Sequence, residues 1–288
     1  MDVVWKLAST TTYEPSEIYQ MAAIEFKDVL DKEIGRPFEY LDPETEERFK
    51  KKNRTPAVAQ KMLASYCAKR VPQIRRNFKL VEVEKPFIVP TSIDNVLYVG
   101  RMDKVVRWLS SDGKLWAIEH KTTSDGSGKS GFYTSWSEQW NPNSQVEGYA
   151  FTGRMLWKDF SGVILDGTLV NNASQHEALI TVDPVDDVLE AWLFDLEEEV
   201  TRILFYLERL GNQPGNTKTM QAFPRHTISC MDYKQPCMYK NICMSTGNPH
   251  RMTDDQMLMT NPNFMIKKWS PFDELKLASL GLVDTEEE

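Results

Sequence analysis

The period of the hydrophobic pattern changes along this chain, and that change constrains the fold more than any other feature of the sequence. Between residues 79 and 121, polar and apolar residues alternate with a period of two, as in the run LVEVE at residues 80–84. Successive side chains of a strand point to opposite faces, so this pattern predicts half-buried strands. The sequence SDG at residues 111–113 is typical of a hairpin turn. Residues 79–121 are therefore expected to form an antiparallel meander of three strands.

Helical and strand-like segments then follow one another. A helix is predicted from about Asn143 to Trp157, then strands at residues 163–170 and 177–182. The pair Asp183-Pro184 is expected to open a long amphipathic helix that Gly211 closes, because Asp is a good N-cap and Pro suits the first turn. This order predicts an α/β fold with a central mixed β-sheet flanked by helices.

The other segments complete the predicted domain organisation. Residues 1–78 are expected to form a helical region divided by prolines, and residues 79–211 the α/β core. Residues 212–250 read as a loop-like segment that holds three of the four cysteines, and residues 251–288 as a tail. A chain of 288 residues can bury about 70–75% of its unfolded surface, so its core needs no disulfides.

Charge and hydropathy exclude several classes of protein. The 34 Lys and Arg residues and 42 Asp and Glu residues give a net charge of −8, which excludes nucleic-acid binding by bulk positive charge alone. A nuclease stays compatible, since a metal-binding pocket is itself acidic. No apolar run approaches the ~20 residues that span a bilayer, and the N-terminus lacks a signal-peptide stretch. We therefore expect no membrane partner and a cytoplasmic location, in the host cytoplasm if the protein is viral.

The pattern that carries chemistry is Asp103, then fifteen intervening residues, then Glu119-His120-Lys121. On a strand, Glu119 and Lys121 share one face while His120 points the other way. The hairpin pairs the strand of Asp103 with this strand, so Asp103 can approach Glu119. Two carboxylates beside an ammonium group suit Mg²⁺ or Mn²⁺, with the lysine positioning or deprotonating the attacking water.

An acid-x-lysine triplet on a strand is common, and its simplest interpretation is a set of ordinary outward-facing residues. The wider pattern favours a site. An apolar run leads into the triplet, Thr122 and Thr123 follow it, and the next helix carries Gln145 and Tyr149 four residues apart. That spacing places an amide and a phenol on one helix face beside the triplet.

The segments GRMDKVV, LWAIEHKTTS and NSQVEGYA resemble the PD-(D/E)xK nuclease superfamily, specifically its RecB-like branch, over about residues 80–182. The resemblance implies a restriction-endonuclease-like nuclease core and a Mg²⁺- or Mn²⁺-dependent deoxyribonuclease. It implies that the carboxylates of Asp103 and Glu119 and the backbone carbonyl of His120 bind the metal. It also implies that Lys121 is a catalytic lysine and that Gln145 and Tyr149 form a Q-x-x-x-Y motif.

Many RecB-like nucleases place a further metal ligand on an N-terminal helix. No histidine precedes His120 in this sequence, so that ligand has no direct counterpart. Glu84, on the preceding predicted strand, is the candidate. A solvent-facing strand residue is the alternative interpretation of Glu84.

The cysteines form a second pattern, with Cys230, Cys237 and Cys243 within 14 residues and His226 just before them. Some RecB-like nucleases, including CRISPR-associated, helicase-linked and phage enzymes, bind a [4Fe–4S] cluster through one cysteine before the nuclease motifs and three after them. That resemblance implies Cys67 as the first ligand, although the gap between Cys230 and Cys237 is wider than in the family pattern. Structural Zn²⁺ on His226 and the three later cysteines is one alternative, and unliganded thiols are another.

The sequence therefore predicts a metal-dependent DNA exonuclease acting in DNA recombination, repair or phage DNA processing. DNA is the expected partner, with a single-strand annealing or recombination protein as a second one. The choice of exonuclease rests on family analogy. The alternatives are a structure-specific or nicking endonuclease on the same fold, and a non-catalytic DNA-binding subunit.

Overall fold

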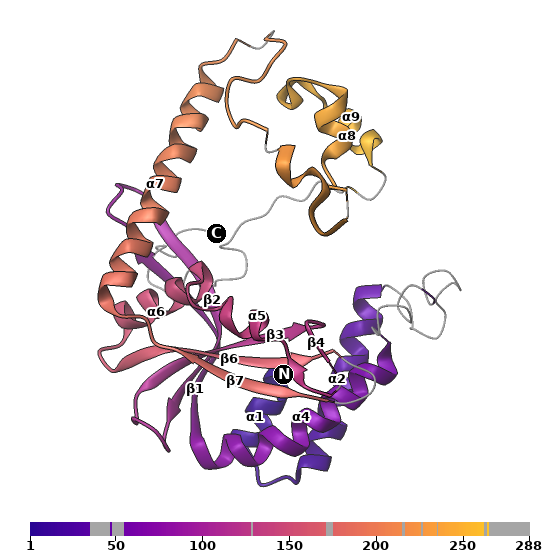
Figure 1. Ribbon diagram of the computed structural model, residues 1–288, viewed down its shortest axis with the longest axis vertical. Coiled ribbons are helices and arrows are strands. Elements are labelled where there is room, and N and C mark those ends of the chain that lie inside the picture. Colours follow the sequence, from indigo (N-terminus) through magenta and orange to yellow (C-terminus); the bar gives the residue numbers. More distant parts are fainter. Residues whose placement is uncertain are drawn as a thin grey trace, which may run out of the picture. The chain divides into compact units, whose positions relative to one another are not determined.

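A five-stranded mixed sheet in the order β1-β2-β3-β6-β7 forms the centre of the fold (Figure 1). The computed structural model describes residues 1–34, 47, 55–127, 129–170, 175–214, 217–225, 227–234, 236–261 and 264. The strands of the sheet are β1 (Phe78–Pro90), β2 (Leu97–Trp108), β3 (Leu115–Thr123), β6 (Phe160–Leu169) and β7 (Glu177–Val182). Neighbouring strands are antiparallel except for the parallel pair β3–β6. The prediction of an α/β fold with a mixed sheet flanked by helices is confirmed.

The meander β1–β2–β3 also confirms its prediction. Strand β1 contains Pro86 and Pro90 and lies at an edge of the sheet, which is where prolines are tolerated in strands. The segment after β3 holds the two-residue strands β4 (Gly126–Ser127) and β5 (Gly131–Phe132), which pair with each other. Helix α5 (Thr134–Glu138) follows them.

Three N-terminal helices pack on one face of the sheet, namely α1 (Asp2–Thr10), α2 (Pro15–Ile34) and α4 (Pro56–Asn77) (Figure 1). Two prolines begin helices, but Pro72 lies inside α4, so the prediction that each proline divides the region is wrong there. Buried residues on both sides of Pro72, such as Tyr66 and Ile74, anchor α4 to the sheet and carry the helix past it.

Helix α6 (Ser144–Leu156) covers the opposite face and provides the crossover between the parallel strands β3 and β6. Its N-terminus is fixed by Asn143, whose side chain accepts hydrogen bonds from the backbone N–H groups of Gln145 and Val146. Near its C-terminus, Gly153 packs directly on the ring of Phe160, where a Cβ atom would overlap the ring. The cap and this close contact set the height of α6 over the sheet.

Helix α7 (Asp186–Gly211) begins two residues later than the sequence predicts. The carboxylate of Asp183, expected to cap the helix, instead accepts a hydrogen bond from Arg154 at 2.8 Å. The chain forms two compact units, Met1–Leu193 and Phe194–Glu288. None of the described helices combines the length and apolar character that a membrane crossing requires.

The second unit contains short helices where a loop was expected. They are η2 (Thr227–Lys234), α8 (Lys240–Ser245) and η3 (Pro249–Arg251), followed by α9 (Asp254–Thr260) in the predicted tail. In α9, a reciprocal capping box between Thr253 and Gln256 satisfies two backbone donors at the helix N-terminus. Most of the predicted tail, residues 265–288, lies outside the described residues.

Candidate active site

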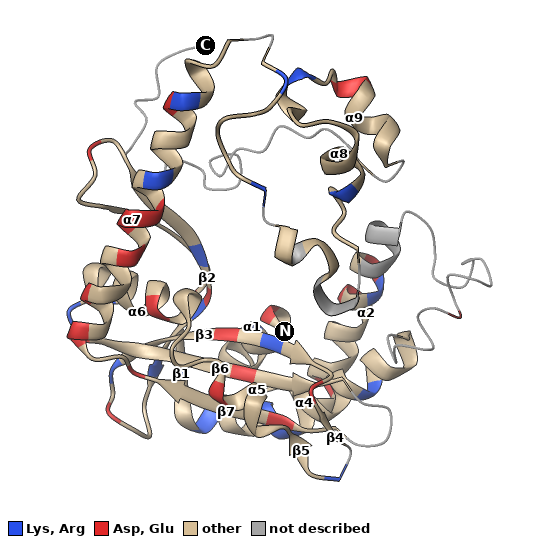
Figure 2. Ribbon diagram, turned by 45° about the horizontal axis from the view of Figure 1, so that its top comes forward, with Lys and Arg blue, Asp and Glu red and all other residues tan. Residues whose placement is uncertain are grey.

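Strand β3 presents Glu119 and Lys121 to the α6 face of the sheet, as the alternation predicts. Acidic and basic positions lie close together on this strand in Figure 2. The ammonium group of Lys121 donates hydrogen bonds to Glu119 Oε1 at 2.7 Å and to Gln145 Oε1 at 2.8 Å. The ring of His120 lies on the other face, with centroid distances of 6.4 Å to Trp5 and 6.2 Å to Tyr66.

The Q-x-x-x-Y pair of α6 is joined to both neighbouring strands. Gln145 Nε2 donates to Glu119 Oε1 at 2.9 Å and to the hydroxyl of Tyr149 at 3.2 Å. The Tyr149 hydroxyl in turn donates to the backbone carbonyl of Arg101 on β2 at 2.8 Å. Because the amide nitrogen of Gln145 donates to two partners and its oxygen accepts from Lys121, the orientation of the amide is fixed. The predicted grouping of these four side chains is therefore present in the structure.

Asp103 lies where β2 and β3 separate. The paired register of the two strands ends at Lys104–Ile118, and beyond it Asp103 Oδ2 accepts a hydrogen bond from the backbone N–H of His120 at 3.0 Å. The N–H and C=O groups of one strand residue point to the same side. The carbonyl of His120 therefore points towards the Asp103 side, as the resemblance requires.

Burial gives this cluster its electrostatic character. Glu119 is only 6% exposed, and its Oε2 atom is a buried acceptor for which the described residues supply no hydrogen-bond donor. Leaving such an acceptor unsatisfied costs about 1–3 kcal/mol, so a ligand at this position would be favoured. Burial also raises the pKa of the Tyr149 hydroxyl to about 12; the charges of Glu119 and Asp103 act in the same direction, and the hydrogen bond with Gln145 opposes them. Tyr149 therefore stays a neutral donor.

Glu84, the candidate for a further metal ligand, lies across β2 from this cluster. It falls between the register pairs Val83–Lys104 and Lys85–Met102, which places it opposite Asp103. Its φ of 52° is in the left-handed region that non-glycine residues rarely adopt. Its Oε2 atom pairs with Arg101 Nε at 2.6 Å. Burial raises the pKa of Glu84, and the charge of Arg101 opposes that effect.

The metal-binding capacity of the cluster comes from two carboxylates. Among the described residues, no three His, Cys, Asp or Glu side chains lie close enough together to hold a metal ion. Glu84 therefore does not complete a three-carboxylate set in this arrangement. Mg²⁺ is usually bound by one or two carboxylates, with waters and substrate phosphates filling the other positions. Asp103, Glu119 with its unpartnered oxygen and the carbonyl of His120 fit that requirement.

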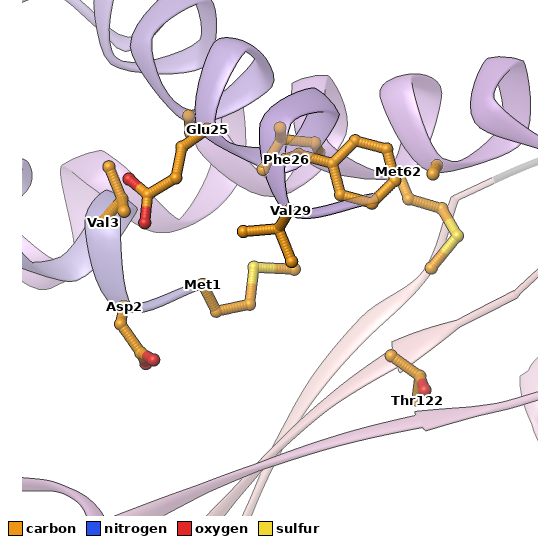
Figure 3. Close-up of a pocket in the computed structure, with 11 residues that line it drawn as sticks. Met1, Asp2, Val3, Glu25, Phe26, Val29, Met62 and Thr122 are labelled. Atoms are coloured by element: carbon orange, nitrogen blue, oxygen red, sulfur yellow. The ribbon is translucent and has the colours of Figure 1, made fainter. Parts of the chain in front are cut away.

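A cavity of about 480 Å³ lies on the other side of the sheet, among α1, α2, α4 and the end of β3 (Figure 3). Its described lining is mainly apolar and includes Phe26, Val29 and Met62. The charged side chains in that lining, Asp2 and Glu25, are both acidic. A mainly apolar cavity whose Asp2 is already paired with Lys104 offers few groups to hold a metal ion and a phosphate, so we place the candidate site at the Glu119 face instead.

The four cysteines are divided between the two units. Cys67 is 1% exposed in the hydrophobic core between the N-terminal helices and the sheet. In the second unit, the backbone N–H of Cys237 donates to the carbonyl of Cys230 at 2.9 Å, and Cys243 follows on α8. These three thiols are partly exposed and belong to one short segment. His226, the additional ligand of the zinc alternative, lies outside the described residues.

Comparison with known proteins adds little to this geometry. No family model matches the chain, and no curated protein matches it. Among solved structures, the chain shows a similarity to one titled "Crystal structure of SSO0001", with 16% sequence identity over 54% of this chain and 68% of that chain. The TM-score of 0.28 is too low for any argument about fold or function to rest on it.

The thiols provide a direct test of this structure. Burial raises the pKa of the Cys67 thiol to about 11. Because the thiolate is the reactive form, we expect a thiol-specific reagent at neutral pH to label Cys67 more slowly than the other three cysteines by a factor on the order of 100. The measurement is a labelling time course on reduced protein kept metal-free with a chelator. Cys67→Ser should remove the slow phase and leave three fast thiols; four fast thiols in the wild type would contradict the burial of Cys67.

Proposed function

We propose that this protein is a metal-dependent DNA exonuclease built on a restriction-endonuclease-like nuclease core. The observation that carries the proposal is the convergence of Asp103, Glu119 and Lys121 where β2 and β3 separate, together with the unpartnered oxygen of Glu119. The resemblance of the surrounding segments to RecB-like nucleases supports the same chemistry. Exonuclease rather than endonuclease activity rests on that resemblance.

The proposed metal site consists of Asp103, Glu119 and the carbonyl of His120. A bound Mg²⁺ or Mn²⁺ would stabilise negative charge on the scissile phosphate and make water easier to deprotonate. Lys121 is the proposed group that orients the attacking water, since its ammonium is held between Glu119 and Gln145. Tyr149, kept neutral by burial, anchors α6 to the Arg101 carbonyl and so keeps Gln145 in place.

The cysteines are proposed to hold a [4Fe–4S] cluster, through Cys67, Cys230, Cys237 and Cys243. The segment that carries the last three fits this role, because it brings partly exposed thiols into one short stretch. Cys67 as placed does not fit, because it is buried among apolar side chains that disfavour a thiolate. Structural Zn²⁺ bound by the later cysteines and His226 is the alternative. Substitution of Cys67 distinguishes the two, because only the cluster would use this cysteine.

The proposed biological setting is DNA recombination, repair or phage DNA processing in the cytoplasm, which is the host cytoplasm if the protein is viral. DNA is the substrate, and a single-strand annealing or recombination protein is the proposed partner. These assignments follow from the class of enzyme alone.

Substitution of the active-site residues tests the enzyme directly. Glu119→Ala and Lys121→Ala should each lower DNA cleavage by at least about 100-fold, because they remove the groups that stabilise charge and orient water in the transition state. DNA affinity, measured by fluorescence anisotropy, should stay within a few-fold of wild type. The matched controls are Glu138→Ala and Lys129→Ala, which remove the same side chains at exposed positions and should leave cleavage unchanged. Cleavage within a few-fold of wild type in either active-site variant would refute the assignment.

The form of the DNA separates the alternatives in the same assay. An exonuclease degrades end-labelled linear DNA and spares covalently closed circles, whereas an endonuclease cuts both. A protein that binds DNA but cuts neither form with Mg²⁺ or Mn²⁺ would be the non-catalytic subunit.

DNA cleavage should depend on a divalent metal ion. Mg²⁺ or Mn²⁺ should support cleavage, whereas Ca²⁺ should support DNA binding with little turnover because its looser coordination activates water poorly. Cleavage rates measured after EDTA treatment and again after each ion is added back provide the test. Undiminished cleavage in EDTA would exclude the whole mechanism.

Metal analysis decides the role of the cysteines. With a cluster, protein purified without oxygen should be brown, and Cys67→Ser should lose iron as completely as Cys243→Ser, because the cluster needs all four thiolates. Visible absorbance and metal content are the measurements. A colourless protein with one zinc per chain, emptied by His226→Ala but unaffected by Cys67→Ser, would show that the site is a zinc site.

A further inference from the structure

A buried polar network lies directly behind the candidate active site, on the opposite face of β3. Its centre is Asp166 on β6, which is the register partner of His120 in the parallel pair β3–β6. Asp166 is 1% exposed, and its Oδ2 atom lies 3.3 Å from His120 Nδ1. The imidazole is thus held by a carboxylate from the neighbouring strand.

Helices α1 and α4 occupy the remaining positions around this carboxylate. Arg70 Nε donates to Asp166 Oδ1 at 3.0 Å, and the hydroxyl of Tyr66 donates to Oδ2. The indole N–H of Trp5 donates to the Tyr66 hydroxyl at 2.8 Å. Burial by itself would raise the pKa of Asp166, but its contacts with His120, Arg70 and Tyr66 outweigh burial and lower it. Asp166 is therefore ionised, and each of its carboxylate oxygens accepts a hydrogen bond from a donor on α4.

Such a network is poorly explained as a source of stability. A buried ion pair is often no more stabilising than apolar residues of the same volume, because removing the charges from water costs about as much as their attraction returns. What hydrogen bonds to both oxygens of a buried carboxylate do provide is one fixed arrangement of that carboxylate and its partners. The question is then what this arrangement fixes.

The answer lies in the position of His120 between Glu119 and Lys121. Its side chain is clamped on one face of β3, while the two flanking side chains point to the other face. Its backbone N–H is bound by Asp103, and its carbonyl points to the same side. A rotation of the strand about its axis would move the imidazole, the carbonyl and both flanking side chains together. Holding the imidazole therefore holds the active-site groups.

We propose that Asp166 is a positioning residue of the candidate metal site, acting through His120. By fixing the imidazole, it sets the rotation of β3 and with it the directions of the Glu119 carboxylate and the His120 carbonyl. This inference rests on the proposed nuclease function. When a residue that orients a metal ligand without contacting the metal is replaced, the affinity for the metal typically falls about 10–100-fold.

The test is Mn²⁺ affinity in the absence of DNA, measured by titration calorimetry on the full chain. His120→Phe is the first variant, because the phenyl ring retains the packing against Trp5 and Tyr66 but has no nitrogen to contact Asp166. It leaves Asp166 bonded to Arg70, so the network keeps its ion pair. We expect the dissociation constant for Mn²⁺ to rise about 10–100-fold.

Asp166→Ala removes the same contact from the other side, together with the Arg70 ion pair, and the double variant with His120→Phe should bind Mn²⁺ no more weakly than the weaker single variant. The matched control is Arg70→Met, which breaks the ion pair of the same network but leaves the contact between His120 and Asp166. Urea unfolding measures the destabilisation of each variant. Arg70→Met should be destabilised more than His120→Phe, yet its Mn²⁺ affinity should stay within about three-fold of wild type.

Two outcomes would overturn the positioning role. One is a His120→Phe protein that binds Mn²⁺ as tightly as the wild type. The other is a loss of Mn²⁺ affinity in Arg70→Met as large as in His120→Phe, which would make the network a purely structural element. A wild-type protein that neither binds Mn²⁺ nor cleaves DNA would instead remove the proposed function and the inference with it.

Discussion

Strand β3 serves both faces of the sheet at once, because successive side chains of a strand point in opposite directions. Glu119 and Lys121 meet α6 on one face, and His120 meets α1 and α4 on the other. Three consecutive residues thereby join two separately packed layers of helices. The hydrophobic clusters on the two faces keep the strand from slipping, since a shift of one residue would exchange every side chain between them. The candidate site and the network behind it both depend on that register.

Two buried carboxylates, Glu119 on β3 and Asp166 on the neighbouring β6, are each paired with a cation. The ammonium group of Lys121 neutralises Glu119, while Arg70 neutralises Asp166. Burying a charge without a partner is costly, so each pair is needed for the chain to fold around these residues. The Glu119 pair still leaves one carboxylate oxygen without a donor among the described residues, whereas both oxygens of Asp166 are bonded. That difference distinguishes a site open to a ligand from a clamp.

The basic residues of α4 show that a cluster of positive charges in a sequence can serve contacts within the protein and need not bind a nucleic acid. Lys69 pairs with Glu177 on β7, and Arg75 donates to the backbone carbonyls of Ala8 and Thr11. Together with the buried Arg70, these side chains hold α4 against the sheet and against α1. These positive groups are already used within the protein. In a chain of net charge −8, a surface that binds the phosphates of DNA would therefore need other basic residues.

Local patterns in the sequence determined the meander, the crossover helix and the alignment of Gln145 with Tyr149, because periods of two and of nearly four follow from backbone geometry alone. They misplaced the start of α7, where Asp183 found a partner in Arg154 that no local rule could reveal. Only the tertiary structure placed Asp166 behind His120 and Tyr66 above it, since these contacts join residues as far as 100 positions apart in the sequence. The register between β3 and β6 comes from burying both faces of the sheet together, and a single segment carries no record of the strand that will lie beside it.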